Sequence, residues 1–285
     1  MRWHGGRRSD NVEDRRGLPV GGKGLAFGGI GTLVIALIAM YFGVDPSLVF
    51  NQVAAPPAMG QQADPGTRSA EENQLAEFSS VVLADTEDVW HALFQTAGSQ
   101  YQEPRMVLFT GAVQSACGHA QAAMGPFYCP GDQKLYLDLS FFSDLHTRYG
   151  APGDFSQAYV IAHEVGHHVQ NLMGLLEKTH AAKARSSETE ANALQVRVEL
   201  QADCYAGVWA NRAHEARQIL EQGDIDEALA AAAGVGDDRL QQQSRGYVVP
   251  ESFTHGSSEQ RKRWFMIGAQ SGDPSQCNTF KAARL

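Results

Sequence analysis

Two histidines one helical turn apart place the strongest constraint on how this chain can fold. The segment His163-Glu164-Val165-Gly166-His167 lies in an apolar stretch, and a helix is predicted from Phe155 to about Met173, with Gly174 after its end. Side chains four residues apart lie on the same helix face, so both imidazoles can reach one metal ion. Glu164 flanks that face, where its carboxylate can take a proton from water activated by the metal.

A catalytic zinc ion needs a third protein ligand and an open position for water. Glu199 is the best candidate, because it lies on a second predicted helix with Asp203 one turn later. Asp203 would then accept a hydrogen bond from a ligand histidine and orient its ring. His180, in the polar stretch after the first helix, is an alternative ligand. His168 is expected to pack or to be exposed, and Gly166 to allow a neighbouring helix to approach.

The N-terminal part of the chain contains a long uncharged run. Residues 25–44 comprise twenty amino acids without a charge, enough for a helix to cross a bilayer. Six basic and three acidic side chains precede the run in residues 1–24, and no Lys or Arg follows it until Arg68. This asymmetry predicts one transmembrane helix in the cytoplasmic (inner) membrane, with the N-terminus in the cytoplasm and the body in the periplasm or outside the cell. A cleaved signal peptide is the alternative.

The domain organisation follows from this run. We expect a cytoplasmic basic segment at 1–24, a transmembrane helix at 25–44, a linker at 45–72 and a single domain at 73–285. The net charge of the chain is −9 although its first 24 residues are basic, so the body is strongly acidic. An acidic body repels phosphate backbones, and nucleic acid is not expected as a partner. No feature of the sequence indicates an oligomeric state.

The cysteines point to an oxidising compartment. There are four, all beyond the uncharged run, and none forms a C-x-x-C pair, so two disulfides are expected. Three connectivities are possible. We favour Cys117–Cys129, which closes a local loop, together with Cys204–Cys277, which would join the tail to a central helix. Four free thiols are the alternative.

The body combines a small β-region with many helices. Apolar residues between 75 and 94 recur with helical spacing, and 106–109 is a candidate strand. The segment 134–140 alternates apolar and polar residues, which predicts a half-buried strand. Asp154 is expected to cap the helix that follows, and another long helix ends near Gln218. The fold class is therefore α+β and mainly helical.

These motifs resemble known metallopeptidases. His163-Glu164-x-x-His167 followed by Glu199-x-x-x-Asp203 is similar to the gluzincins, in which the Glu is the third zinc ligand and the Asp bonds the first motif His. More narrowly, the chain resembles the bacterial neutral zinc metallopeptidase family of the YpfJ type over almost its whole length. The segments that carry this resemblance are MRWHGGRRSDNVEDRRG, YCPGDQKLYLDLSFF, HEVGHHVQ and ELQADCYAG. It implies a zincin-like (gluzincin) catalytic domain, one Zn²⁺ per chain and a peptide or protein substrate.

A further likeness concerns the segment from Thr254 to Arg261. It is similar to the T-H-P-x-x-x-x-R segment of membrane gluzincins of the HtpX type, in which the His stabilises the oxyanion, although Gly256 replaces the Pro. A tetrahedral intermediate needs a hydrogen-bond donor besides zinc, so His255 is a candidate catalytic residue. Tyr205 and Tyr247 are alternative donors.

The sequence thus favours a membrane-anchored zinc peptidase in which Glu164 is the general base. By analogy with gluzincins, the strand at 134–140 would be the sheet edge that pairs with an extended substrate. Two alternatives remain: a catalytically silent, membrane-tethered zinc-binding scaffold, and a zinc hydrolase of a non-peptide amide.

Overall fold

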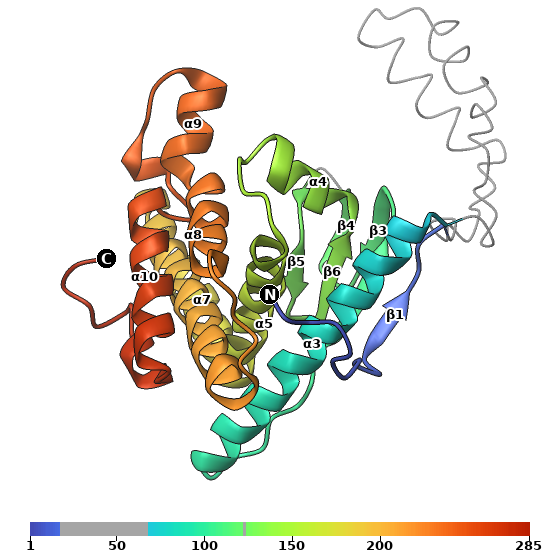
Figure 1. Cartoon of the computed structure of the whole chain (residues 1–285). Coiled ribbons are helices and arrows are strands. Elements are labelled where there is room, and N and C mark those ends of the chain that lie inside the picture. Colours follow the sequence, from blue (N-terminus) through green and yellow to red (C-terminus); the bar gives the residue numbers. More distant parts are fainter. Residues whose placement is uncertain (18–67, 122–123) are drawn as a thin grey trace, which may run out of the picture. The chain divides into compact units, whose positions relative to one another are not determined.

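A small mixed sheet and a group of helices make up the body of the protein (Figure 1). The computed structural model describes residues 1–17, 68–121 and 124–285, and the elements below belong to that part of the chain. The strands are β1 (Val12–Asp14), β2 (Arg105–Phe109), β3 (Ala112–Ser115), β4 (Gly118–Gln121), β5 (Phe127–Cys129) and β6 (Lys134–Asp138). The helices are α3 (Ala70–Thr96), α4 (Ser140–Thr147), α5 (Asp154–Leu172), α6 (Leu175–Lys183), α7 (Glu188–Arg217), α8 (Asp224–Gly234), α9 (Asp237–Arg245), η2 (Pro250–Ser252), α10 (Ser258–Ser271) and η3 (Pro274–Cys277).

The main sheet has the strand order β1-β2-β6-β5, and β3 and β4 form a separate hairpin. Strands β1, β2 and β6 are parallel, whereas β5 runs antiparallel to β6. The strand predicted at 106–109 is confirmed. The strand predicted at 134–140 is present but ends at Asp138, because Ser140 begins helix α4. However, β6 is an inner strand and is buried on both faces, as Leu135 and Tyr136 show. The expectation of a half-buried strand at the sheet edge was wrong, because β5 covers that edge of β6.

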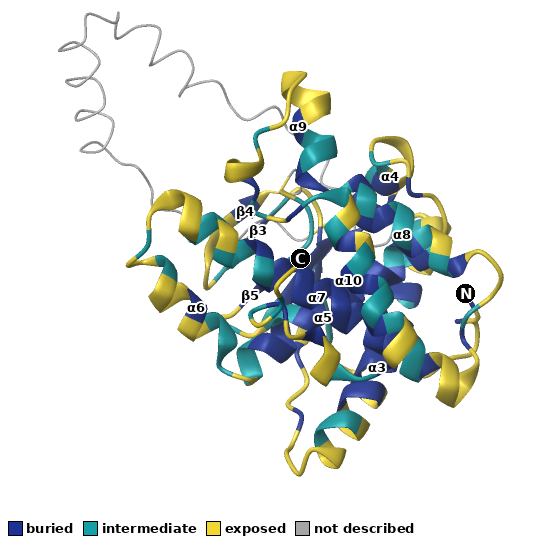
Figure 2. Cartoon of the chain, turned by 90° about the vertical axis from the view of Figure 1, so that its left-hand side faces the viewer, coloured by how far each residue is buried: buried dark blue, intermediate teal, exposed yellow. Residues whose placement is uncertain are grey.

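Helix α5 lies at the centre of the helical layer, next to α3, α7 and α8 and to strand β5. Figure 2 shows α5 and α7 as largely buried, while α6 is mostly exposed and α9 is exposed in its second half. The predicted helix from Phe155 to Met173 is confirmed to within a residue at each end. The predicted cap is not: Gly153 is the N-cap residue, and Glu227 accepts the hydrogen bond from the Phe155 N–H. Asp154 instead binds the ammonium of Met1 at 2.6 Å.

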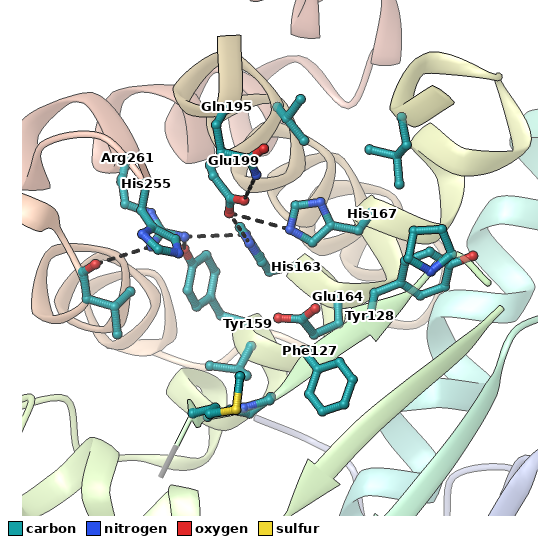
Figure 3. Close-up of a pocket in the computed structure, with 18 of the residues that line it drawn as sticks. Phe127, Tyr128, Tyr159, His163, Glu164, His167, Gln195, Glu199, His255 and Arg261 are labelled. Atoms are coloured by element: carbon teal, nitrogen blue, oxygen red, sulfur yellow. Dashed lines mark hydrogen bonds and ion pairs between the residues drawn. The ribbon is translucent and has the colours of Figure 1, made fainter. Parts of the chain in front are cut away.

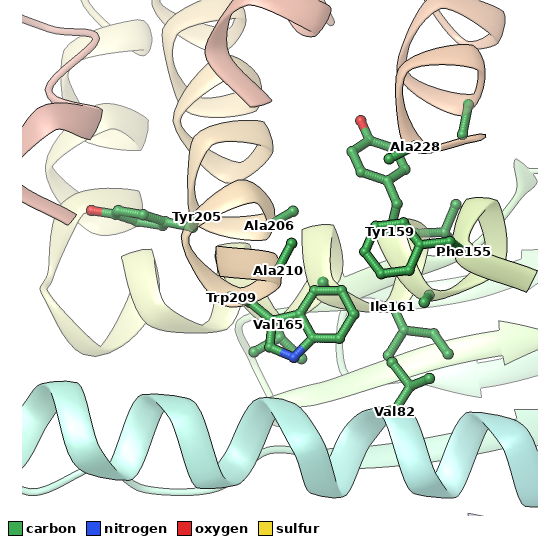
Figure 4. Packing of buried hydrophobic residues seen from close by; sticks show 14 of the residues in the cluster. Val82, Phe155, Tyr159, Ile161, Val165, Tyr205, Ala206, Trp209, Ala210 and Ala228 are labelled. Atoms are coloured by element: carbon green, nitrogen blue, oxygen red, sulfur yellow. The ribbon is translucent and has the colours of Figure 1, made fainter. Parts of the chain in front are cut away.

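The core between α3, α5 and α7 is built around Trp209 (Figure 4). Its indole stacks on Phe155 with ring centroids 5.7 Å apart. Burying the indole N–H without a partner would cost free energy, and Asp85 of α3 accepts its hydrogen bond at 3.0 Å. Val82 and Val165 complete the contact between the helices. This packing holds α5 and α7 in a defined relative position.

Both favoured disulfides are present. Cys117 is bonded to Cys129, which ties the turn of the β3–β4 hairpin to strand β5. Cys204 of α7 is bonded to Cys277, close to the end of the chain. The prediction of two disulfides with this connectivity is confirmed.

The N-terminal residues are part of the body. Residues 1–16 and 70–285 form one compact unit, in which β1 pairs with β2. Glu13 of β1 also accepts a hydrogen bond from Lys134 of β6 at 2.7 Å. Residues 1–24 were expected to be separate from the body, and the first sixteen differ from that expectation.

The predicted transmembrane helix must be corrected. Residues 25–44 and most of the predicted linker lie outside the described residues, and none of the described helices is long and apolar enough to cross a membrane. The supported fold class is a mainly helical α+β domain with a small sheet. The predicted single-pass location in the inner membrane is likewise not supported. An N-terminus in the cytoplasm and a body outside would place a bilayer between β1 and β2, which are paired strands.

Candidate metal centre

Helices α5 and α7 bring three metal-binding side chains to one point (Figure 3). Glu199 Oε2 lies 3.2 Å from His163 Nε2 and 3.4 Å from His167 Nε2. One donor atom of each residue lies within 4.8 Å of the others. Two imidazoles from one helix and a carboxylate from a neighbouring helix therefore face a common centre, as the sequence analysis expected.

A glycine allows the two helices to come this close. A methyl group at Gly166 would lie 3.0 Å from the Ala202 carbonyl oxygen and 3.1 Å from its Cα. Real side chains rarely tolerate such contacts, so α5 and α7 pack backbone to backbone here. The predicted packing role of Gly166 is confirmed, and this contact brings Glu199 within reach of the histidines.

Each histidine is oriented by a hydrogen bond at its other nitrogen. His163 Nδ1–H donates to Asp203 Oδ1 at 2.8 Å, and His167 Nδ1–H donates to Gln170 Oε1 at 2.9 Å. When Nδ1 of the neutral ring carries the proton, Nε2 keeps its lone pair for a metal. Asp203 was expected beside a ligand histidine. Gln170 was not predicted, and its only local signal is its position three residues after His167.

Asp203 is the centre of a buried charged network that also includes Arg261 and Tyr159. Arg261, only 3 % exposed, donates to both carboxylate oxygens, from Nε at 2.9 Å and from Nη2 at 2.8 Å. Tyr159 donates its hydroxyl to Asp203 Oδ1. Burial alone would raise the pKa of Asp203, but the charges of Arg261 and His163 lower it to about 2. Asp203 is thus held as a carboxylate behind His163.

The donors fit a zinc ion in spacing and in charge. Four-coordinate zinc with bonds of about 2.0–2.1 Å separates neighbouring ligand atoms by roughly 3.3 Å, close to the two distances above. Burial would raise the pKa of Glu199, but the adjacent histidines hold it well below its usual range. Burial would lower the pKa of His163, but Asp203 and Glu199 raise it to about 9. The pocket therefore favours positive charge where the three donors meet.

The three donors line a cavity of about 530 Å³. Glu164 lines it too, with 9 % of its surface exposed, and Figure 3 shows its carboxylate near Tyr159 and Phe127. Apolar and aromatic side chains from several elements form much of the remaining wall, including Met124, Phe127, Phe141, Tyr149, Val160, Leu176 and Leu240. The cavity thus combines a metal-binding corner with apolar walls, as small-molecule and peptide sites commonly do.

His255 also lines the cavity, on the same side as Arg261 (Figure 3). Its ring is half exposed, and Nδ1 lies 3.3 Å from Asp237 Oδ1. The other oxygen of Asp237 accepts the backbone N–H groups of Thr254, His255 and Gly256 at 2.7, 2.6 and 3.0 Å. The hydrogen bond with Asp237 raises the pKa of His255 against the effect of burial. Asp237, which the sequence analysis did not identify, therefore fixes both the loop and the ring.

The other sequence candidates lie away from the donors. Tyr205 is buried and directs its hydroxyl to Met173, and Tyr247 is 59 % exposed; neither lines the cavity. His180 lines the cavity but is not in the donor group. His168 is buried: Nε2–H donates to the Gln102 carbonyl at 2.6 Å, and Nδ1 accepts from Tyr128 at 2.9 Å. The buried ring of His168 therefore connects α5 to Tyr128 of β5.

This arrangement defines a class of protein, namely an α+β domain that can hold one metal ion on two helices. The chain belongs to the family described as "Putative neutral zinc metallopeptidase", whose profile matches residues 1–280. It is 50 % identical to the protein YpfJ of Escherichia coli (strain K12) over 289 aligned residues, which cover 98 % of this chain and 99 % of that protein. It is also 44 % identical to the protein Rv2575 of Mycobacterium tuberculosis (strain ATCC 25618 / H37Rv) over 264 residues, 87 % of this chain and 86 % of that protein. No solved structure matches the chain.

Proposed function

We propose that this protein is a zinc-dependent peptidase that hydrolyses peptide bonds with one zinc ion per chain. The observation that carries the proposal is the convergence of His163, His167 and Glu199 beside Glu164 in one cavity. Membership of a zinc metallopeptidase family supports the same reaction class. A zinc ion bound there supplies a Lewis acid that polarises a carbonyl and makes water more acidic.

The residues of the chain have distinct tasks in this proposal. Glu164 takes the proton of the attacking water and later passes it to the leaving amine. His255, oriented by Asp237, donates a hydrogen bond to the substrate oxygen that becomes negatively charged. Asp203 and Gln170 keep the Nε2 atoms of the ligand histidines free for the metal.

Strand β5 is the proposed docking edge for the substrate. It ends the sheet, and among the described residues it pairs only with β6. Phe127 and Tyr128 of β5 line the cavity that contains the donors. An extended peptide could add a strand along β5 and thereby bring a peptide bond to Glu164. This assignment replaces the earlier hypothesis that residues 134–140 form the edge.

Substitution of the proposed base tests the function directly. Glu164→Gln keeps the size of the side chain but removes its basicity, so we expect the variant to bind zinc as the wild type does and to lose hydrolysis by at least about 100-fold. Zinc content and cleavage of a mixed peptide library would be measured on both proteins. Glu177 lies at the exposed start of α6, so Glu177→Gln is the matched control and should retain activity.

Undiminished cleavage by Glu164→Gln would contradict the assignment of Glu164 as the general base. A wild type that binds zinc but cleaves no peptide would favour a scaffold or a non-peptide amidase.

A further inference from the structure

The carboxylate donor of the metal centre has a hydrogen-bonded partner of its own. Glu199 Oε1 accepts a hydrogen bond from Gln195 Nε2 at 2.7 Å, while Oε2 faces the two histidines. Gln195 lies one turn before Glu199 on α7, so the two side chains lie over the same helix face. The contact occupies one carboxylate oxygen and leaves the other for a metal. It corresponds to the contacts that Asp203 and Gln170 make with the histidines.

The orientation of the Gln195 amide is determined by a third residue. Lys183, in the last turn of α6, donates from Nζ to Gln195 Oε1 at 2.6 Å. An ammonium can only donate and an ionised carboxylate can only accept. The amide therefore has a single orientation that satisfies both neighbours, with its oxygen toward Lys183 and its nitrogen toward Glu199. All three side chains line the cavity.

We propose that Gln195, oriented by Lys183, is a positioning residue that holds Glu199 as a one-oxygen metal ligand. The inference rests on the proposed zinc function and deepens it. The proposal also assigns a role to α6, because the end of this mostly exposed helix is connected to the metal centre through two consecutive hydrogen bonds. Lys183 acts on Glu199 through Gln195.

The physical consequence is preorganisation of the carboxylate. Without Gln195 the two oxygens of Glu199 are equivalent, and the side chain can rotate or present both of them. Loss of an outer partner of a metal ligand typically weakens metal binding about 10- to 100-fold. Since Lys183 only orients the amide, its removal should cost less than removal of Gln195.

A double-mutant cycle on zinc affinity tests the inference. We would measure the zinc Kd of the full chain by competition with a chelator for wild type, Gln195→Met, Lys183→Met and the double variant. Methionine matches the length of glutamine and is one atom shorter than lysine, and it removes the donors and acceptors. We expect Gln195→Met to raise the Kd about 10-fold or more and Lys183→Met to raise it less. The double variant should be no worse than Gln195→Met, because Lys183 has no effect once the amide is gone.

Two controls keep the result interpretable. Lys178 lies on α6 but does not line the cavity, so Lys178→Met should leave the zinc Kd unchanged. Thermal unfolding of the metal-free proteins should be the same for wild type and Lys183→Met, whose side chain lies at the end of α6. If Gln195→Met fails to fold, Lys183→Met alone still tests the inference through its raised Kd.

The outcomes separate this inference from the proposed function. A wild type that binds no zinc would overturn the function and the inference together. A wild type that binds zinc, with a Kd unchanged in Gln195→Met, would overturn only the positioning role. Effects of Gln195→Met and Lys183→Met that add in full would overturn the dependence of Lys183 on Gln195.

Discussion

Arg261 is a buried side chain on which both the candidate metal centre and the stability of the fold depend. It forms a two-point contact with Asp203, and both residues are buried beside a candidate zinc ligand. A buried ion pair is costly to form, but removal of one partner leaves an uncompensated charge in a poorly solvated place. This role of Arg261 was not predicted from the sequence, in which Arg261 is only the last residue of the motif that begins at Thr254.

Replacement of Arg261 should therefore destabilise the fold strongly. We expect Arg261→Met to lower the free energy of unfolding by about 3–5 kcal/mol, because Asp203 stays buried without its cation. The measurement is urea unfolding of the metal-free protein. Arg263→Met, two residues later, removes a pair with the exposed Glu259 and should cost less than about 1 kcal/mol. Similar losses for the two variants would contradict the argument.

At the scale of elements, helices α7 and α10 approach through glycines. A methyl group at Gly268 of α10 would lie 1.9 Å from the Cys204 carbonyl oxygen, and one at Gly207 of α7 would lie 2.1 Å from the Phe265 carbonyl oxygen. No rotation of a side chain relieves these contacts, because the obstructing atoms belong to the backbone. The helices would have to separate.

We accordingly expect Gly268→Ala to be destabilising although alanine favours helices. The separation of α7 and α10 should cost about 1–3 kcal/mol or more, well above the gain in helix propensity of roughly 1 kcal/mol. Thermal unfolding compared with Gln270→Ala, on the exposed face of α10, would measure it. A stabilised Gly268→Ala protein would show that the helices can adjust freely.

For the whole molecule, the two disulfides close loops of very different length. Cys117–Cys129 spans 12 residues and Cys204–Cys277 spans 73. If the constraint on the unfolded chain dominates, they contribute roughly 3 and roughly 4 kcal/mol respectively. The double substitution Cys204→Ala/Cys277→Ala should then lower the midpoint of urea unfolding more than Cys117→Ala/Cys129→Ala does. The reverse order would mean that local packing, and not loop length, decides.

The attachment of the N-terminal strand should depend on pH. Burial would raise the pKa of Glu13, but hydrogen bonds and charges from Lys134 and Arg15 lower it below 4.5. A lowered folded-state pKa means that this stabilisation is fully present above about pH 4.5 and is lost as the pH falls through the lowered value. We expect Glu13→Gln to unfold at a lower temperature than wild type near neutral pH, and the difference to shrink under acid. The exposed Glu188→Gln serves as control; a gap that persists at low pH would contradict this role.

The local parts of the candidate site could be predicted from the sequence. His163, Glu164 and His167 belong to one helix, and helical spacing alone determines that the two imidazoles share a face. Helix α5 itself followed from its apolar periodicity and from Gly174, which adopts the left-handed conformation after the helix end. The cap was not predictable, because Asp154 and Glu227 have partners that are distant in sequence.

Only the tertiary structure decided how the site is completed. The third donor, Glu199, lies 36 residues from His163, and its place depends on the close packing of α5 against α7. The contacts of Asp237 with His255 and of Arg261 with Asp203, the inner position of β6 and the pairing of β1 with β2 also depend on how distant segments pack. Gln170 and Gln195, by contrast, lie one turn from the residues that they orient, within the same helices. The sequence by itself determined the metal-binding helix and, through four cysteines, a disulfide-bonded body. Contacts between distant elements decided the rest, since spacing along a chain specifies geometry only within one element.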